Sequence, residues 1–258
     1  MGLELYLDLL SPACRVVYIF AKANRIPFEY KVVALMKGEQ LSEDFGKVNP
    51  LKKVPALKDG DFTMSESIAI LQYLAEKYKL SDHWYPANLE KRAKINEFLL
   101  WHVNVVRPLM VKDFWFKVMA PTLLGRTAPA ERLEAVAQEF STVLDQFEKT
   151  FLQGKTYISG EEISVADVVS FCDLIQMGDV HLSVYNNSNM SLTTRTGQNI
   201  FEKRPKMAAW RQNVESHIGL ELINEAQKAA LSAGSYSKDS MDPKGVEWLT
   251  ARVKLLLP

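Results

Sequence analysis

Cysteine is scarce in this chain, and neither sign of charge is in excess. Among 258 residues there are two cysteines, Cys14 and Cys172, which are too few for a disulfide framework and fit a reducing compartment. Lys plus Arg and Asp plus Glu both count 31, so no overall field favours nucleic acid or an anionic membrane surface. Any site for an anion must therefore be local.

Targeting and membrane signals are also missing. No apolar run approaches the length of a transmembrane helix. The first ten residues contain Glu4 and Asp8 and no basic group, which argues against a signal peptide. The four histidines, at positions 83, 102, 181 and 217, show no metal-ligand spacing, so no metal site is expected. We predict a cytoplasmic protein without a membrane span and without a nucleic-acid partner.

Residues 1–82 predict a small α/β domain. Leucines alternate over 3–7 as in a strand, a helix begins at Pro12, and apolar side chains alternate again over 28–32. Two strands joined through a helix are expected to be parallel. The Asp-Gly turn inside 53–64 adds a hairpin, and a helix from Ser65 follows it. The sheet is therefore predicted to be mixed.

Residues 88–258 predict helices only. A helical pattern covers 88–119 with Pro108 inside it, where we expect a kink. Ser164 and Asp167 form a capping-box pattern before an apolar helix. Another helix is expected to begin at Pro129. Three more are expected over 205–217, 220–232 and 244–256.

The segment 180–199 has no helical period. It is rich in Asn, Ser and Thr, and an insertion of this length without regular structure is unusual inside a compact domain. We predict a mobile surface loop with no catalytic role.

Ser11 stands where the first strand ends and a helix begins. A helix N-terminus directs its N–H groups at whatever lies before it, which favours an anion. Two interpretations are open here, a helix cap and a functional hydroxyl. Ser-Pro-Ala-Cys resembles a redox Cys-X-X-Cys motif whose first cysteine is replaced by a hydroxyl, which argues against a thiol oxidoreductase. Cys14 is interpreted as a small buried side chain.

The stretch "NPLKKVPALKDGDFTMSESIAIL", residues 49–71, places a proline before an apolar strand. A cis Val54–Pro55 bond would turn the Val54 backbone outward, where it pairs with a peptide-like ligand. Glu66 and Ser67 lie in the first turn of the next helix, where free N–H groups take a carboxylate and Glu66 takes an amine. Each residue also has a plain structural reading as a cap, a dipole partner or a solvated charge.

The segments "LELYLDLLSPACRVVYIFAK", "VNPLKKVPALKDGDFTMSESIAILQYL" and "RPKMAAWRQNVE" resemble the theta class of the cytosolic glutathione transferases. The resemblance covers nearly the whole chain. It implies the glutathione transferase fold: a thioredoxin-like N-terminal domain over 1–82 and an all-helical domain over 88–258 that supplies the electrophile site. It also implies a homodimer, with glutathione as co-substrate and no cofactor.

The resemblance also implies roles for single residues. Ser11 would be the catalytic hydroxyl that hydrogen-bonds the glutathione sulfur. The implied glutathione contacts are Gln40 and Lys53 at the glycine end, Val54 at the cysteinyl backbone, Glu66 and Ser67 at the γ-glutamyl end, Asn104, and Arg107 near the sulfur. Trp115, with Phe114 and Met119, is the candidate wall of the electrophile pocket, and packing in a helix core explains these three residues equally well. Gln40 stands where relatives often have histidine.

The implied activity is conjugation of glutathione to small hydrophobic electrophiles such as alkyl halides and sulfate esters, or reduction of organic peroxides. The alternative is a non-catalytic interaction module with the same fold, as in elongation-factor subunits. Ser11 together with Glu66 and Ser67 favours the enzyme, because a scaffold has no need of both.

Overall fold

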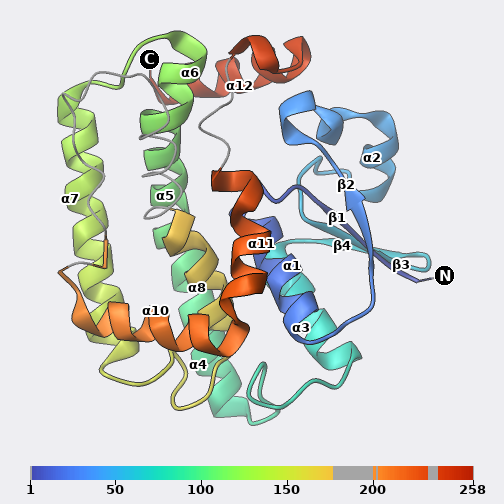
Figure 1. Cartoon of the computed structure of the whole chain (residues 1–258), viewed down its shortest axis with the longest axis vertical. Coiled ribbons are helices and arrows are strands. Elements are labelled where there is room, and N and C mark those ends of the chain that lie inside the picture. Colours follow the sequence, from blue (N-terminus) through green and yellow to red (C-terminus); the bar gives the residue numbers. More distant parts are fainter. Residues whose placement is uncertain (1, 177–199, 202, 232–237, 258) are drawn as a thin grey trace.

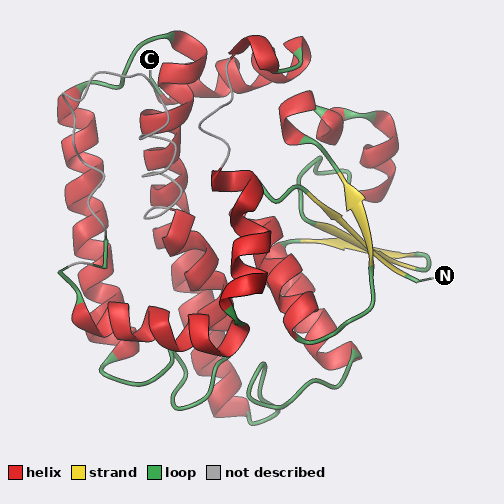
Figure 2. Cartoon of the chain, in the orientation of Figure 1, coloured by secondary structure: helices red, strands yellow, loops and turns green. Residues whose placement is uncertain are grey.

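The computed structural model describes residues 2–176, 200–201, 203–231 and 238–257, drawn as coloured ribbon in Figure 1. The predicted loop 180–199 lies outside the described residues. A small sheet flanked by helices forms the N-terminal part, and the rest of the described chain is helical, as Figure 2 shows. The predicted combination of a mixed-sheet domain and an all-helical domain is confirmed.

The sheet has four strands in the order β2-β1-β3-β4. They are β1 (Leu3–Leu7), β2 (Glu29–Val32), β3 (Ala56–Asp59) and β4 (Phe62–Ser65). β1 runs parallel to β2 and antiparallel to β3, and β3 and β4 form an antiparallel hairpin. Both predicted pairings are confirmed.

Three helices belong to this domain: α1 (Pro12–Ala23), α2 (Glu43–Val48) and α3 (Ser67–Lys77). α1 begins at a proline, as expected, because the fixed φ of proline suits a first helical turn. α3 begins at Ser67 and not at Ser65, because Ser65 still pairs with Ala56 in the hairpin. Glu66 between them has φ of 71°.

The helical domain contains α4 (Leu89–Trp101), α5 (Arg107–Phe114), α6 (Ala120–Leu124), α7 (Ala130–Gln146), α8 (Val165–Ile175), α10 (Pro205–Ile218), α11 (Leu220–Leu231) and α12 (Pro243–Leu256). α4, α5 and α6 follow one another through π turns over His102–Val106 and Trp115–Met119. Each π turn comes just before a proline, Pro108 or Pro121. Proline has no N–H for the regular helical bond, and a widened turn accommodates that loss. The expected disturbance at Pro108 therefore takes the form of a π turn.

α8 is the central helix of this domain, and all of its residues are buried. The predicted capping box forms at its start: the Asp167 carboxylate accepts the backbone N–H of Ser164 at 2.9 Å. The same carboxylate accepts the N–H of Ile158 at 2.8 Å and the indole N–H of Trp210 at 2.9 Å. A buried carboxylate with this many donors has its polar atoms satisfied.

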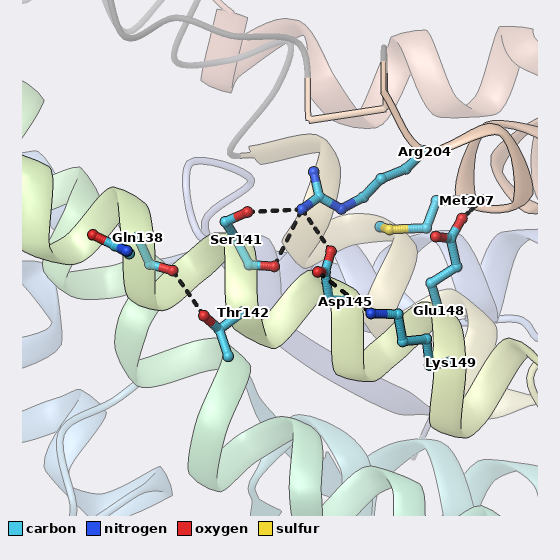
Figure 3. A network of polar contacts seen from close by, with 8 residues as sticks. All are labelled: Gln138, Ser141, Thr142, Asp145, Glu148, Lys149, Arg204 and Met207. Carbon is cyan, nitrogen blue, oxygen red and sulfur yellow. Dashed lines mark hydrogen bonds and ion pairs between the residues drawn. The ribbon is translucent and has the colours of Figure 1, made fainter.

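Arg204 ties the beginning of α10 to α7 (Figure 3). Its Nη2 atom lies 2.9 Å from Asp145 Oδ1 and 2.9 Å from Ser141 Oγ. The backbone N–H of Met207 reaches Glu148 in the same region. These contacts fix the outer helix α7 against α10.

The two domains share one hydrophobic core. α1 packs against α8 and α11, and α3 also contacts α8. α12 leaves the helical domain and crosses to the segment that follows β2, at the top of Figure 1. None of the helices in the described ranges combines the length and the apolar character needed to cross a bilayer.

Candidate active site

Pairing in the sheet brings four segments that contain predicted site residues to the same edge, the one formed by the C-terminal ends of β1, β2 and β4 and the start of β3. Leu7 at the end of β1 lies opposite Val32 at the end of β2. Ala56 at the start of β3 lies opposite Tyr6 in β1 and Ser65 at the end of β4. The chain segments that contain Ser11, Gln40, Val54 and Glu66 all leave or enter the sheet at this edge.

Ser11 is the N-cap residue of α1, and its side chain makes no capping hydrogen bond. Its backbone N–H donates to Asp8 O at 2.9 Å. Asp8 in turn accepts the N–H of Leu10 at 3.0 Å and that of Leu35 at 2.8 Å, which fixes the turn before the helix. The structure therefore disfavours the reading of Ser11 as a simple cap.

A cavity of about 290 Å³ opens beside Ser11. Its walls come from both domains and are mostly apolar, and the three residues expected there, Phe114, Trp115 and Met119, line it. Trp248 and Leu249 of α12 add to the lining, so the last helix covers part of the cavity. An apolar, partly enclosed space next to a hydroxyl suits a small hydrophobic molecule.

α12 reaches the N-terminal domain by a close backbone contact. A Cβ atom on Gly245 would lie 2.9 Å from the carbonyl oxygen of Met36, so only glycine fits without a shift. The backbone N–H of Asp242 donates to the same carbonyl at 3.3 Å. Met36 also lines the cavity, so this contact joins the covering helix to the cavity wall.

Cys14 is fully buried, and burial raises the pKa of its thiol to about 12. Burial likewise raises the pKa of the Cys172 thiol to about 12. The neutral thiol is a poor nucleophile, so neither cysteine serves redox chemistry at neutral pH. The interpretation of Cys14 as a buried packing residue is confirmed.

Two unusual backbone features flank the hairpin. The Val54–Pro55 bond is cis, as predicted. Asn49, which is buried, donates from Nδ2 to the carbonyl of Lys53 at 2.7 Å and so holds the loop before that bond. Glu66 is exposed and keeps a positive φ, an unusual conformation for a residue other than glycine.

Gln40 lies in the segment after β2 and is 1% exposed. Neither its Oε1 nor its Nε2 has a hydrogen-bond partner within the described part of the chain. A buried amide with both ends unsatisfied is rare in a folded protein and costs free energy. Gln40 is therefore suited to a polar group that the protein itself does not supply.

Arg107, from the beginning of α5, reaches the N-terminal domain. Its Nη1 lies 3.4 Å from Oγ of Ser67, and its Nε donates to Oδ2 of Asp173 at 2.9 Å. The same Oδ2 lies 2.8 Å from Nε2 of His102, and Ser170 Oγ lies 3.2 Å from Nδ1 of His102. Burial lowers the pKa of His102, so the ring is neutral, donates from Nε2 and accepts at Nδ1.

Two expected contacts lie outside this constellation. Lys53 is exposed at the rim of the hairpin edge. Asn104 is exposed on the first π turn, and its Nδ2 donates to the carbonyl of Leu100 at 2.8 Å. Neither residue lines the cavity beside Ser11.

Sequence reasoning missed Asp8, Arg15, Asn49 and Gln176. Arg15 is a fully buried arginine within α1, and Gln176 follows α8 at the cavity wall. A charged residue in the apolar run "ACRVVYIFA" was the one available signal, since arginine is rarely buried without partners. Nothing local in the sequence marks the other three. Around the site and elsewhere in the described ranges, no group of His, Cys, Asp or Glu side chains is placed to hold a metal ion.

Two family models match the chain. One describes the glutathione S-transferase N-terminal domain and matches residues 5–82, and the other describes the C-terminal domain and matches residues 130–213. Human glutathione S-transferase theta-1 is 44% identical over 98% of this chain and its own full length. Mouse glutathione S-transferase theta-3 is also 44% identical, over 100% of both chains.

Solved structures agree. The apo form of human glutathione-S-transferase T1-1 superposes with a TM-score of 0.86 over 100% of both chains at 44% identity. A human theta-class glutathione transferase, in complex with the glutathione conjugate of 1-menaphthyl sulfate, gives the same TM-score at 37% identity and full coverage of both chains. Glutathione is the co-substrate of this family. This chain therefore belongs to the theta class of the glutathione S-transferases.

Proposed function

We propose that this protein ionises bound glutathione at Ser11 and transfers it to small electrophiles with an apolar body. The substrate classes are alkyl halides and sulfate esters, with organic peroxides as oxidants that the thiolate reduces. The observation that carries the proposal is the opening of Ser11 into an apolar cavity walled by both domains. The relative crystallised with a conjugate of 1-menaphthyl sulfate supports the sulfate-ester class.

Glutathione lies along the sheet edge in this proposal. Val54 pairs with the cysteinyl backbone, Glu66 and Ser67 hold the γ-glutamyl end, and Gln40 with Lys53 holds the glycine carboxylate. The unsatisfied amide of Gln40 and the exposed carboxylate of Glu66 support these assignments.

Two further residues complete the proposed set. Arg107 approaches from the helical domain, where the Asp173 contact fixes one side of its guanidinium. Its Nη2, which has no partner among the described residues, is then the end that remains for the ligand. A contact from Asn104 stays a prediction.

Activation of the thiol needs a moderate free energy. Lowering the pKa of a thiol from about 8.5 by about two units corresponds to about 2.7 kcal/mol. A hydrogen bond from the Ser11 hydroxyl to the charged sulfur contributes about 1.5 to 3 kcal/mol. The N-terminus of α1 adds about 0.3 to 1 kcal/mol. Ser11 and its helix therefore suffice without a general base.

The reaction with a halide or sulfate ester is a displacement. The thiol proton passes to water, the sulfur forms a bond to carbon, and the halide or sulfate leaves with the bonding electrons. With a peroxide the thiolate attacks oxygen and releases an alcohol, and a second glutathione reduces the resulting sulfenic acid. The apolar walls keep water from the electrophile.

We also propose a homodimer in the cytoplasm. Leu51 and Phe62 of the N-terminal domain and Leu100 of α4 are large apolar side chains left exposed. Exposed apolar side chains on both domains support an interface between copies, and two identical copies most simply pair about a two-fold axis. Analytical ultracentrifugation tests this: a monomer at micromolar concentration contradicts it.

A panel of electrophiles assayed with glutathione tests the function: an alkyl iodide, 1-menaphthyl sulfate and cumene hydroperoxide. Ser11→Ala should still bind glutathione, while the apparent pKa of the bound thiol rises by about one to two units in an ultraviolet difference titration. Cys172→Ala removes the second fully buried thiol, which comes from α8; it is the control and should leave that titration unchanged. A folded wild-type chain that turns over none of the three favours the interaction module instead.

A further inference from the structure

The cavity beside Ser11 has one polar side chain with an unusual support. Gln176 follows α8, is 5% exposed, and lines the cavity together with Ser11. Its amide oxygen accepts a hydrogen bond from Nη2 of Arg15. The two residues come from different domains.

Arg15 is itself held rigidly. It is fully buried, and its Nη1 donates to the carbonyls of Leu9 and Leu10 at 2.7 and 3.1 Å. These carbonyls belong to the turn that leads into Ser11. A buried guanidinium with three fixed acceptors leaves Gln176 little freedom.

The chemistry of arginine decides how the amide is oriented. A guanidinium donates hydrogen bonds and accepts none, so Oε1 of Gln176 must face Arg15. The amide Nε2, with two N–H groups, is then the opposite end of the carboxamide. Because Gln176 is part of the cavity wall, this end is the one available to a molecule inside it.

The other side-chain donors in the cavity wall are the indole N–H groups of Trp115 and Trp248 and the hydroxyls of Ser11 and Thr122, and within the described chain none of these four groups is supported by a buried arginine. The wall consists mainly of Leu, Met, Val, Phe and Ala side chains, with the indoles of two tryptophans. The hydroxyl of Thr122 already donates to the carbonyl of Val118 at 2.8 Å. Ser11 is assigned to the sulfur in the proposed function.

We propose that Nε2 of Gln176 is a preoriented hydrogen-bond donor for the leaving-group oxygen of the electrophile, and that it makes the site selective for sulfate esters over alkyl iodides. This inference rests on the proposed function of the same cavity. A leaving oxygen gains negative charge as the bond to carbon breaks, so a fixed donor binds it more strongly in the transition state. An iodide accepts hydrogen bonds poorly and gains much less.

The sharpest variant is Gln176→Glu. A carboxylate keeps the acceptor that Arg15 needs and nearly the same shape, while it removes both N–H donors. We expect kcat/KM for 1-menaphthyl sulfate, divided by kcat/KM for ethyl iodide, to fall about 10- to 100-fold. An effect of the new charge on the glutathione thiol acts on both substrates and cancels in this ratio, but repulsion of the anionic sulfate ester does not. The uncharged variant Gln176→Met separates that repulsion from the loss of the donor.

Gln138→Glu is the matched control, because Gln138 is exposed on α7, far along the chain and outside the cavity wall. Its ratio should equal that of the wild type. The melting temperature of each variant, measured alongside, shows whether the fold is kept. Gln176→Met also lacks the donor but carries no charge. It is the second test variant, and the ratio of the two kcat/KM values should fall in it as well.

Three outcomes are distinct. A fall of the ratio in both Gln176 variants, with the control unchanged, supports the donor. A wild-type protein that turns over both substrates, with an unchanged ratio in Gln176→Glu and Gln176→Met, overturns the donor alone and leaves the proposed function standing. A wild-type protein that turns over neither substrate overturns the proposed function and this inference with it.

Discussion

Oδ2 of Asp173 lies 2.9 Å from Nε of Arg107; the carboxylate is fully buried, whereas the Arg107 side chain is 20% exposed. The same oxygen accepts a hydrogen bond from Nε2 of His102. The buried Asp173 carboxylate therefore orients both the Arg107 guanidinium and the neutral His102 ring. Burial alone would raise the pKa of Asp173, but the charge of Arg107 and the hydrogen bond from His102 keep it below its ordinary value. Asp173 therefore stays ionised at neutral pH.

Asp173→Asn should lower the free energy of unfolding by about 3 to 5 kcal/mol, because it leaves the buried side of Arg107 without its countercharge. Urea unfolding at pH 7.5 measures this. Glu97→Gln is the control: it removes a partner of Lys94 in an exposed pair at 2.7 Å, which is worth less than about 1 kcal/mol. Equal effects of the two substitutions would contradict the assignment.

The two thiols should be unreactive in the folded protein. Both cysteines are fully buried, and burial raises the pKa of each to about 12. Titration with an aromatic disulfide reagent at pH 7.5 should therefore detect neither thiol in the native protein and both thiols in the protein unfolded in urea. Rapid labelling of one thiol in the native protein would show that the burial of Cys14 or Cys172 is wrong.

Gly245→Ala should disturb the cover of the cavity. The added methyl would lie 2.9 Å from a backbone carbonyl at Met36, so α12 must shift. We expect KM for the electrophile to change by about threefold or more, equivalent to roughly 0.7 kcal/mol, with glutathione binding nearly unchanged. Lys244→Ala, an exposed neighbour on the same helix, serves as the control. An unchanged KM in Gly245→Ala would mean that α12 does not contact the substrate.

Stability should fall as the solution is acidified below about pH 6.5. Burial lowers the pKa of His102 against the opposing effect of Asp173, and burial with the nearby His83 lowers the pKa of His217. Below the ordinary histidine pKa of about 6.5, the unfolded chain takes up protons that the folded chain does not, so the free energy of unfolding decreases.

Urea unfolding at pH 7.5 and pH 5.5 measures this decrease. His102→Gln should reduce the difference between the two pH values, since one of the two shifted groups is gone. The absolute stability of the variant will also change, so the comparison is between the two differences. A pH dependence identical to that of the wild type would show that the pKa of His102 is the same in the folded and the unfolded chain.

Most of the fold was predictable because its signals are local. Alternating leucines, the proline at the start of α1 and the Asp-Gly turn each act within a few residues, and together they define the mixed sheet. The capping box at Ser164 is local in the same way. The motif around Pro55 also led to the proposal that glutathione binds along this part of the sheet.

The long-range contacts were not predictable. Arg15 and Gln176 are 161 positions apart, and no period or motif relates them. In the sequence Asp173 is an acidic residue in an apolar helix, and nothing near it indicates its partners. Arg107 and His102 become its partners only when α5 and the turn before it pack beside α8. The start of α3 was two residues off because the hairpin takes Ser65 first. Pairs of this kind depend on tertiary packing, which a single sequence does not display.

The arrangement around Arg15 limits how this enzyme can be divided or recombined. The turn before Ser11 lies in the first part of the chain and is held by Arg15. Arg15 is in turn held by Gln176, which follows α8 in the helical domain. A chimera that takes its first 82 residues from one relative and the remainder from another would inherit the serine and a mismatched anchor. A chimera is expected to keep its activity only if residues 15 and 176 come from the same parent protein. The contact between these two residues, and not the boundary between the domains, therefore determines which segments can be exchanged.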